Sequence, residues 1–350
     1  MVRILYGVCG VGMGHAVRSK VILEYLEKKH ELVIVSSHES YHFLKRDFKK
    51  VYSIEGFELV LSRNAILNFK TFLKNFRKAS WENYLGFKKT EEKINQFHPE
   101  LVISDWETYT SLYAKKYYVP LISLDNAHYL LFGKYHYPRS YYLQYLKAKK
   151  VLESLMVKAK HYLVLCFDHQ ELRPLPEVSK GLSVLREGVL KAKPSIEDFV
   201  LVYLTSRQYK EIGIILQSVD ERFILYGNEN KSEKNLEFRR FGETKGFIQD
   251  LVRCKAVISS GGFTLLSEAI HLGKPLFVLP LKNHFEQLLN ALYIEKYGYG
   301  VYKVNPQRED FVSFFKKLES YSQERNPRKD NKLFFTELER VMGKVLEDVS

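Results

Sequence analysis

Cysteine is scarce in this chain: three residues, Cys9, Cys166 and Cys254, lie far apart among 350. Such spacing fits neither a disulfide framework nor a cysteine-based metal site, and it is typical of a protein from a reducing cytoplasm. Long apolar runs are also missing, since none approaches the roughly 18 residues of a membrane-spanning helix. The N-terminal apolar stretch has no small-residue cleavage pattern, so it predicts a strand and not a signal peptide. We therefore expect a cytoplasmic protein without a spanning helix.

Acidic residues are too few to balance the basic ones: 41 Asp and Glu stand against 54 Lys and Arg, for a net charge of +13. This excess indicates an anionic partner, such as a membrane surface, a nucleic acid or a charged substrate. Two segments, 68–89 and 129–160, interleave aromatic residues with basic ones. Such a segment fits the surface of an anionic membrane, and it equally fits a helix that packs its aromatic residues inward. No recognised nucleic-acid-binding motif occurs, so we expect no nucleic acid partner.

The order of predicted elements is that of an α/β protein. Short apolar strands alternate with stretches of helical periodicity in both halves, the pattern of doubly wound parallel sheets. The length suits two domains, each with its own core. We expect a Rossmann-like domain over 1–172, a linker over 173–198, a second Rossmann-like domain over 199–330, and a closing helix over 331–350 that packs back on the first domain. The predicted strands lie near 3–8, 31–36, 101–104, 120–124, 162–166, 199–204, 222–226, 256–259 and 276–279.

The most informative stretch, 257–290, combines a strand, a glycine turn and a helix. An apolar run ends in Ser260-Gly261-Gly262, and a helix follows from about Phe263. Glycines at that junction let backbone N–H groups approach an anion, and the helix N-terminus adds partial positive charge. One turn later, Glu268 supplies a carboxylate that suits a pair of vicinal hydroxyls. Phosphate followed by diol is the order of groups in a nucleotide, so we expect a nucleotide site here.

These residues resemble the donor-binding domain of the GT-B glycosyltransferases, above all the UDP-glycosyltransferases and the enzyme that adds N-acetylglucosamine to lipid I. The resemblance implies two Rossmann-like domains facing a cleft and a nucleotide-sugar co-substrate, which we expect to be UDP-linked, with no other cofactor. It assigns the diphosphate to the Ser-Gly-Gly turn, the ribose to Glu268 and the donor sugar to the start of the next helix. No DxD motif occurs, which argues against metal-dependent GT-A chemistry, so we expect no metal. The donor-binding residues would be Ser206, Arg207, Phe247, Ile248, Ser260, Gly261, Gly262, Phe263, Thr264, Glu268, Glu286, Gln287 and Asn290.

The N-terminal glycine loop invites another interpretation, a dinucleotide-binding turn. That fingerprint requires glycines spaced GxGxxG and an acidic residue at the end of the second strand. Here the glycines run GxGxG and the second strand ends in Ser36-Ser37-His38, so both tests fail. The loop is instead similar to the acceptor side of the same glycosyltransferases. That resemblance implies an acceptor loop made of Gly10, Gly12, Gly14, Arg18 and Asn126.

His15 closes this loop and is one candidate for the catalytic base. A neutral imidazole accepts a proton from a sugar hydroxyl near pH 7, and a carboxylate behind it fixes the tautomer. In the UDP-glycosyltransferases an aspartate later in the chain has that role, and the candidate here is Asp105, at the end of a strand. Asp125 and His128 follow another strand end, where ligands bind in open α/β sheets. They remain alternatives for the same chemistry.

Taken together, the residues and the resemblance predict a hexosyl- or N-acetylhexosaminyl-transferase that uses an inverting single displacement onto a hydroxyl acceptor. A lipid-linked acceptor and peripheral contact with the inner face of an anionic membrane are further expectations. Two rival functions stay open. A sugar-nucleotide 2-epimerase or hydrolase has the same fold and would act without an acceptor. A basic membrane- or nucleic-acid-binding protein without catalysis would keep that binding after loss of Glu268.

Overall fold

The computed structural model describes residues 1–56, 61–62, 65–66, 70, 83–205, 208–227, 233–240, 244–321 and 328–348. The chain forms two compact units. The first consists of Met1–Val60, Leu67–Val184 and Asn331–Ser350, and the second of Leu61–Ile66 and Leu185–Asp330. The expected donor residues Ser206 and Arg207, and most of the basic aromatic segment 68–89, lie outside the described residues.

The first unit is built on a seven-stranded sheet in which all pairs are parallel, in the order β3-β2-β1-β6-β7-β8-β9. The strand order reverses between β1 and β6, and ligands bind at the carboxyl edge of such a switch point. The central strands are buried on both faces, which explains their continuous apolar runs. The strands are β1 (Arg3–Val8), β2 (Glu31–Ser36), β3 (Val51–Ser53), β6 (Leu101–Asp105), β7 (Leu121–Asp125), β8 (His161–Cys166) and β9 (Val178–Leu182).

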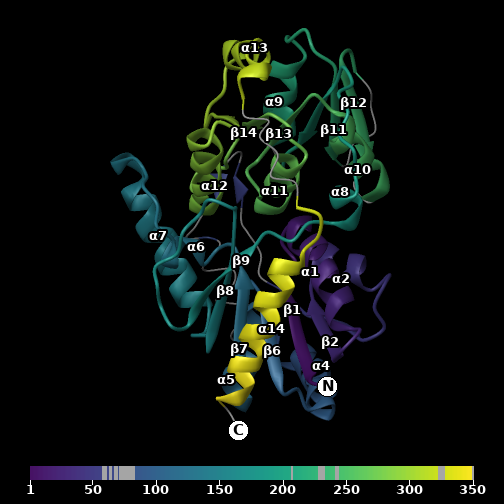
Figure 1. Ribbon diagram of the computed structural model, residues 1–350, viewed down its shortest axis with the longest axis vertical. Helices are drawn as coiled ribbons and strands as arrows, with labels where there is room; N and C mark the ends of the chain where they lie inside the picture. The colour runs from purple at the N-terminus through teal and green to yellow at the C-terminus, as the bar shows by residue number, and fades with distance from the viewer. Residues whose placement is uncertain are drawn as a thin grey trace. The chain divides into compact units, whose positions relative to one another are not determined.

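Helices connect the strands of the first unit, and a helix from the end of the chain joins them (Figure 1). This last helix, α14 (Lys332–Glu347), packs against β9 and β8. The other helices are α1 (Met13–Leu26), α2 (His38–Leu44), α4 (Asn83–Phe97), α5 (Thr108–Tyr117), α6 (Tyr129–Phe132), η1 (Arg139–Tyr141) and α7 (Tyr142–Leu155).

The second unit contains a six-stranded parallel sheet in the order β12-β11-β10-β13-β14-β15 and a short antiparallel hairpin. The sheet strands are β10 (Val200–Tyr203), β11 (Phe223–Gly227), β12 (Leu236–Arg240), β13 (Ala256–Ser259), β14 (Leu276–Val278) and β15 (Gly300–Tyr302), and the hairpin is β4 (Leu61–Ser62) with β5 (Ala65–Ile66). The helices are α8 (Glu187–Leu190), α9 (Gln208–Leu216), α10 (Thr244–Arg253), α11 (Phe263–His271), α12 (Phe285–Lys296), α13 (Arg308–Phe315) and η2 (Leu318–Ser320).

The predicted α/β class with two parallel sheets is confirmed. Among the described strands, the two of the hairpin, β4 and β5, were missed, and so were four edge strands of the parallel sheets: β3 and β9 of one sheet, β12 and β15 of the other. Each edge strand is short or only partly buried, so it lacks the apolar run by which a central strand is recognised. Because β9 lies within 173–198, the stretch expected to be a linker belongs in part to the first sheet.

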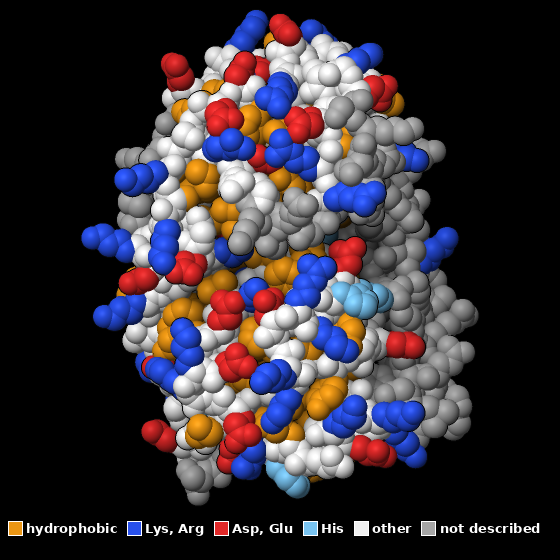
Figure 2. Space-filling model, turned by 90° about the vertical axis from the view of Figure 1, so that its right-hand side faces the viewer, with side chains coloured by type: hydrophobic (Ala, Val, Ile, Leu, Met, Phe, Trp, Pro, Cys, Tyr) orange, Lys and Arg blue, Asp and Glu red, His pale blue; other side chains and the backbone are white. Residues whose placement is uncertain are grey.

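Charge is mixed on the face of the molecule seen in Figure 2. Lys and Arg side chains lie there among Asp and Glu side chains. Such mixing balances charge locally. On this face, therefore, the excess of basic residues behind the net charge of +13 does not gather into a patch of positive charge alone.

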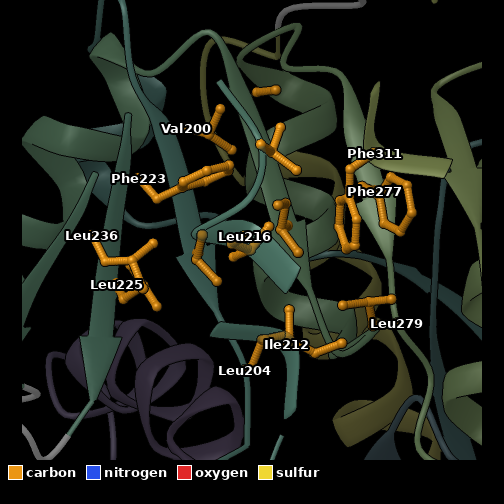
Figure 3. Close-up of a cluster of buried hydrophobic side chains, with 14 of the residues drawn as sticks. Val200, Leu204, Ile212, Leu216, Phe223, Leu225, Leu236, Phe277, Leu279 and Phe311 are labelled. Carbon is orange, nitrogen blue, oxygen red and sulfur yellow. The ribbon is translucent and has the colours of Figure 1, made fainter. Parts of the chain in front are cut away.

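The core of the second unit fixes the strands that carry the glycine turn (Figure 3). The Phe277 ring of β14 stacks on Phe311 with centroids 4.4 Å apart and meets Phe314 edge-on at 5.3 Å. Ile258 of β13 and Leu279, just after β14, belong to the same buried cluster. The ends of β13 and β14, and the loops that follow them, are thereby held by packing.

Candidate functional site

A glycine loop at the carboxyl edge of β1 leads into α1 in the first unit. A Cβ on Gly10 would overlap the Ser37 hydroxyl, so the close approach of these two segments requires glycine. Gly12, the residue before α1, has a φ of 77°, a conformation that favours glycine. Gly14 lies in the first turn of α1. The loop conformation thus depends on its glycines and sets the position of His15.

His15, Arg18 and Asp105 form one hydrogen-bonded cluster at this edge. His15 Nδ1 lies 2.8 Å from Asp105 Oδ1. Arg18 donates from Nε to Asp105 Oδ2 at 2.8 Å and from Nη2 to Asp105 Oδ1, and the Ser19 hydroxyl donates to Oδ2 at 2.9 Å. Positions three apart share a helix face, so α1 directs His15 and Arg18 at one carboxylate. That carboxylate is fully buried, whereas the His15 side chain keeps 21% of its exposure.

The charge state of Asp105 follows from these contacts. Burial raises its pKa, but the Arg18 charge and the His15 contact outweigh burial and hold the pKa far below its ordinary value. Asp105 is therefore ionised at neutral pH and acts only as an acceptor. Arg18 Nη2 also lies 2.8 Å from His15 Nδ1. Because Nδ1 either donates or accepts, it bonds to Asp105 in one tautomer and to Arg18 in the other, and only the first leaves Nε2 as an acceptor.

The backbone after Asp105 is held on a strained turn. Trp106 has a φ of 52°, which is unusual for so bulky a residue and is found at functional sites. Glu107 then caps α5, because its carboxylate accepts from the N–H groups of Tyr109 at 2.8 Å and Thr110 at 2.7 Å. The turn is fixed on both sides, and with it the position of Asp105.

Asp125 and His128 form a second, more deeply buried pair. His128 Nδ1 lies 2.8 Å from Asp125 Oδ2, and the Asp125 carboxylate also accepts from the His128 N–H at 2.9 Å and the Ser123 hydroxyl at 3.0 Å. Burial raises the pKa of Asp125, but the His128 contact outweighs it and the net shift is downward. The His128 ring packs against Phe132 and Tyr162, and its side chain is 4% exposed. Of the two imidazoles, His15 is the more accessible.

Asn126, expected in the acceptor loop, is buried between two strands. Its Nδ2 donates to the Leu165 carbonyl of β8 at 2.8 Å. Within the described part of the chain, its Oδ1 has no hydrogen-bond partner. One half of this amide therefore joins the end of β7 to β8, and the other half is buried.

The second unit presents the Ser-Gly-Gly turn at the start of α11. Gly261 has a φ of 93°, and a Cβ there would lie 3.1 Å from the Gln287 carbonyl, so the position requires glycine. Gly262 is exposed, has nothing within 4 Å of the place where a Cβ would stand, and precedes α11 without a side-chain cap. Phe263 and Thr264, in the first turn, are 3% and 7% exposed. The helix N-terminus is thus open at Gly262, the geometry of an anion site.

The buried side chain of Gln208 fixes the position of the Ser260 hydroxyl. The sequence analysis did not identify Gln208. The Ser260 hydroxyl donates to Gln208 Oε1 at 2.6 Å and accepts from the Thr205 N–H at 3.0 Å. Gln208 Nε2 donates to the Leu279 carbonyl at 2.9 Å, and the side chain is fully buried. The hydroxyl of Ser260 is therefore engaged within the protein and joins the loops after β10, β13 and β14.

Glu268 forms a bidentate ion pair with Arg186, also missed in the sequence. Arg186 donates from Nε to Glu268 Oε1 at 2.7 Å and from Nη2 to Oε2 at 2.6 Å. Glu268 is 1% exposed, and the guanidinium also lies over the Phe247 ring, 5.6 Å from its centroid. Ile248, next to Phe247, lies where a Cβ on Gly188 would touch it. Glu268, expected to hold the ribose, and Phe247, expected to hold the base, thus both contact Arg186.

The residues expected to contact the donor sugar take different positions. Gln287 Oε1 accepts from the Leu281 N–H at 2.9 Å, and Asn290 Nδ2 donates to the Gly261 carbonyl at 3.0 Å. Both amides therefore brace the loop after β14 and the glycine turn. Glu286 lies beside them in the first turn of α12 and is half-buried.

Comparison with known proteins gives the family. The family model described as Glycosyl transferase family 1 matches residues 2–319. The chain belongs to this family. An uncharacterized glycosyltransferase of Methanosarcina mazei is 24% identical over 349 residues, covering 85% of this chain and 84% of that protein.

Several solved structures have the same fold as this glycosyltransferase. UGT2 of Phytolacca americana, complexed with UDP-2-fluoro-glucose and pterostilbene, matches with a TM-score of 0.62 and 12% identity, covering 99% of each chain. MurG of Acinetobacter baumannii matches with a TM-score of 0.60 and 12% identity, covering 98% of this chain and 100% of that one. The spinosyn rhamnosyltransferase SpnG matches with a TM-score of 0.60 and 13% identity, covering 99% and 100%. The predicted resemblance to GT-B glycosyltransferases is confirmed.

The structure of this glycosyltransferase brings together most of the predicted residues within each unit. His15, Arg18 and Asp105 meet in the first unit, and the glycine turn meets Gln287 and Asn290 in the second. The described residues contain no group of three His, Cys, Asp or Glu side chains that would hold a metal ion. In the same part of the chain, no helix has the length and apolar character needed to cross a membrane.

Proposed function

We propose that this glycosyltransferase moves a hexosyl or N-acetylhexosaminyl group from a UDP-linked donor to a hydroxyl acceptor by single displacement with inversion. The observation that carries the proposal is the 2.8 Å contact between His15 Nδ1 and Asp105, on an imidazole that stays 21% exposed. A hydroxyl acceptor requires a base that is both reachable and oriented by a carboxylate. A lipid-linked alcohol is one acceptor class within this proposal, in keeping with the net charge of +13.

In the proposed reaction, the Nδ1–H of His15 donates a hydrogen bond to the Asp105 carboxylate, and Nε2 takes the proton of the acceptor's hydroxyl group. The acceptor oxygen forms a bond to the anomeric carbon of the donor sugar, and the bond from that carbon to the diphosphate oxygen breaks. UDP leaves with the electron pair. Asp105 stabilises the resulting imidazolium, and Arg18 keeps Asp105 ionised while offsetting part of its negative charge.

The second unit supplies the features that we assign to the donor. The open N-terminus of α11 at Gly262 suits the diphosphate, whose negative charge increases as it leaves. Glu268 accepts from Arg186, and because a carboxylate has about four acceptor sites, it would still accept from both ribose hydroxyls. Arg186 would keep this carboxylate oriented.

The uracil nucleotide is proposed from what related structures contain. The Phytolacca americana enzyme was solved with UDP-2-fluoro-glucose, and SpnG was solved with thymidine diphosphate. Both ligands contain a pyrimidine nucleoside diphosphate. The three free cysteines of this chain are buried, and their scarcity supports action in a reducing cytoplasm.

Thermal unfolding with UDP, GDP, TDP, ADP and NAD tests the donor half of the proposal. A ligand at about 100 times its Kd adds about 2.7 kcal/mol to the free energy of unfolding. We expect UDP to stabilise the protein and the Glu268→Ala variant to lose that shift. No stabilisation by any nucleotide would contradict the proposal.

Turnover of UDP-sugars with hydroxyl and lipid-linked acceptors, in the presence of EDTA, tests the chemistry. His15→Ala should lower kcat at least about a hundredfold, because it removes the general base. The exposed His42 of α2 offers a matched control, and His42→Ala should leave kcat unchanged. Release of free sugar or an epimer without any acceptor would instead indicate the hydrolase or epimerase, and loss of activity in EDTA would contradict metal-independent transfer.

A further inference from the structure

Helix α7 of the first unit presents an apolar face to solvent. It packs against η1, and among its side chains only Leu152 is buried. Tyr142, Leu143 and Leu146 are 53%, 69% and 39% exposed. In Figure 1 the helix extends from the left edge of the first unit, away from its strands. Large apolar side chains grouped on an exposed helix mark an interaction surface.

Positive charge surrounds this apolar face. The segment 133–160 holds seven Lys and Arg residues and one acidic residue, Glu153. Lys149 is 3.8 Å from Glu153, whereas Lys147 and Lys150 are exposed, as is Arg139 at the start of η1. This one-sign segment differs from the mixed charges of the face in Figure 2. Tyr142, Leu143, Leu146, Lys147 and Lys150 recur at helical spacing, and we call these five residues the α7 face.

Tyrosines add a further feature beside this face. Tyr145 contacts Tyr142 and Tyr137, with ring centroids 6.3 Å and 5.4 Å apart. Tyrosine suits the boundary between water and lipid, because the ring is apolar and the hydroxyl is polar. Lysine stems likewise lie along apolar surface while their ammonium groups reach outward.

We propose that the α7 face binds the surface of an anionic lipid bilayer, with Leu143 and Leu146 inserted among the lipids and Lys147 and Lys150 at the phosphates. This helix has 14 residues, so it would lie in the plane of the interface. A second copy of the chain fits poorly, because it would bring two surfaces of the same charge together. A nucleic acid would use the lysines but would not need the exposed leucines. The proposal is independent of the glycosyl transfer proposed above.

Sedimentation with vesicles tests it. Full-length protein would be mixed with vesicles of phosphatidylcholine alone or with phosphatidylglycerol at about a third of the lipid, at low and high salt. We expect binding only to the anionic vesicles, weakened by salt. The variants Leu143→Ser/Leu146→Ser and Lys147→Glu/Lys150→Glu should each weaken binding at least about tenfold.

Matched controls come from the second unit. Ile214 is 73% exposed on α9, and Lys210 and Lys316 are also exposed. Ile214→Ser and Lys210→Glu/Lys316→Glu should leave vesicle binding unchanged, and circular dichroism would verify that every variant is folded. Three results would overturn the proposal: equal binding to neutral vesicles, binding that survives both α7 variants, or self-association that only the α7 variants abolish.

Discussion

At the scale of single residues, Asp105 combines a role in orientation with a role in stability. Asp105→Asn preserves shape but removes the charge that orients His15 and neutralises Arg18. We expect kcat to fall at least about a hundredfold, because the imidazole loses its preferred tautomer. We also expect the free energy of unfolding to fall by about 3–5 kcal/mol, because the buried guanidinium loses its partner. Steady-state kinetics and denaturant unfolding measure the two effects.

A second substitution separates these roles. Asp105→Asn/Arg18→Met removes both buried charges, so it should recover part of the lost stability without recovering kcat. If the double variant regained activity as well as stability, Asp105 would serve only to neutralise Arg18.

Glu268 is the residue on which nucleotide affinity should depend. Glu268→Gln removes the charge that would bind ribose hydroxyls and that holds Arg186, so UDP should bind at least about tenfold more weakly. Titration calorimetry with UDP measures this loss. Glu286→Gln is the matched control, since Glu286 was assigned to the sugar, and it should leave UDP affinity unchanged while weakening binding of the UDP-sugar. Equal loss of UDP affinity in both variants would contradict these assignments.

The residues that sequence reasoning missed have a common physical cause. Arg186 and Gln208 act through partners 82 and 52 positions away, Glu268 and Ser260, and neither lies in a local motif. The Gly-Gly turn and His15 could be predicted because their chemistry depends on adjacent residues. The Asp105 contact was predicted from the resemblance to UDP-glycosyltransferases, which implies an aspartate behind the histidine, together with its place at a strand end. Nothing in the sequence indicated that Arg18 shares this carboxylate.

At the scale of elements, the two glycines of the turn before α11 have different roles. Gly261 is required by the backbone conformation, whereas Gly262 leaves room for a ligand. Gly261→Ala should destabilise the protein by about 1–3 kcal/mol, because its φ of 93° and the nearby Gln287 carbonyl disfavour a side chain. Gly262→Ala should leave stability nearly unchanged, because its φ of −67° and open surroundings accept a Cβ. It should nevertheless weaken nucleotide binding. Thermal unfolding with and without UDP distinguishes the two variants. Equal destabilisation by both substitutions would contradict this prediction.

The contact of α14 with the first sheet should make stability depend on pH. Beneath this helix, His161 Nε2 lies 2.9 Å from Ser179 Oγ, which accepts from Arg340. Burial, followed by the Lys344 and Arg340 charges, lowers the pKa of His161 from 6.5 to about 4. Between these values the unfolded chain binds a proton that the folded chain does not, so stability falls as pH drops from about 6.5 towards 4. The loss reaches at most about 3 kcal/mol.

Denaturant unfolding at pH 7 and pH 5 measures this dependence. His161→Gln keeps a polar group for Ser179 but does not titrate, so its stability should change less between the two pH values. An unchanged difference in the variant would assign the pH dependence to other groups.

Central strands and the helices between them could be predicted, because burial on both faces imposes continuous apolar runs. The edge strands β3, β9, β12 and β15 could not, because solvent on one side permits polar residues. For β9, the segment 173–176 just before the strand contains two prolines, which also favours the prediction of a linker. Its place in the first sheet depends on cover from α14, more than 150 residues later along the chain.

At the scale of the whole molecule, the two units differ in how the chain builds them. The first is discontinuous and includes Asn331–Ser350, whereas the second consists mainly of one continuous stretch, Leu185–Asp330. Helix α14 buries five side chains in the first unit, Phe334, Leu338, Val341, Met342 and Val345. Each contributes about 1.5–3 kcal/mol, so their sum is comparable to the whole stability of an ordinary domain, about 5–15 kcal/mol.

Ending the chain at Asp330 should therefore unfold the first unit and leave the second folded around its own core. Hydrogen exchange should show loss of protection in β8 and β9, with protection kept in β10 and β13. Leu338→Asp should reproduce the effect in the full chain, because the position is fully buried, whereas Leu333→Asp should not, because Leu333 is 69% exposed. If β10 and β13 lost protection together with β8 and β9, the units would fold as one, and the returning helix would stabilise the entire enzyme.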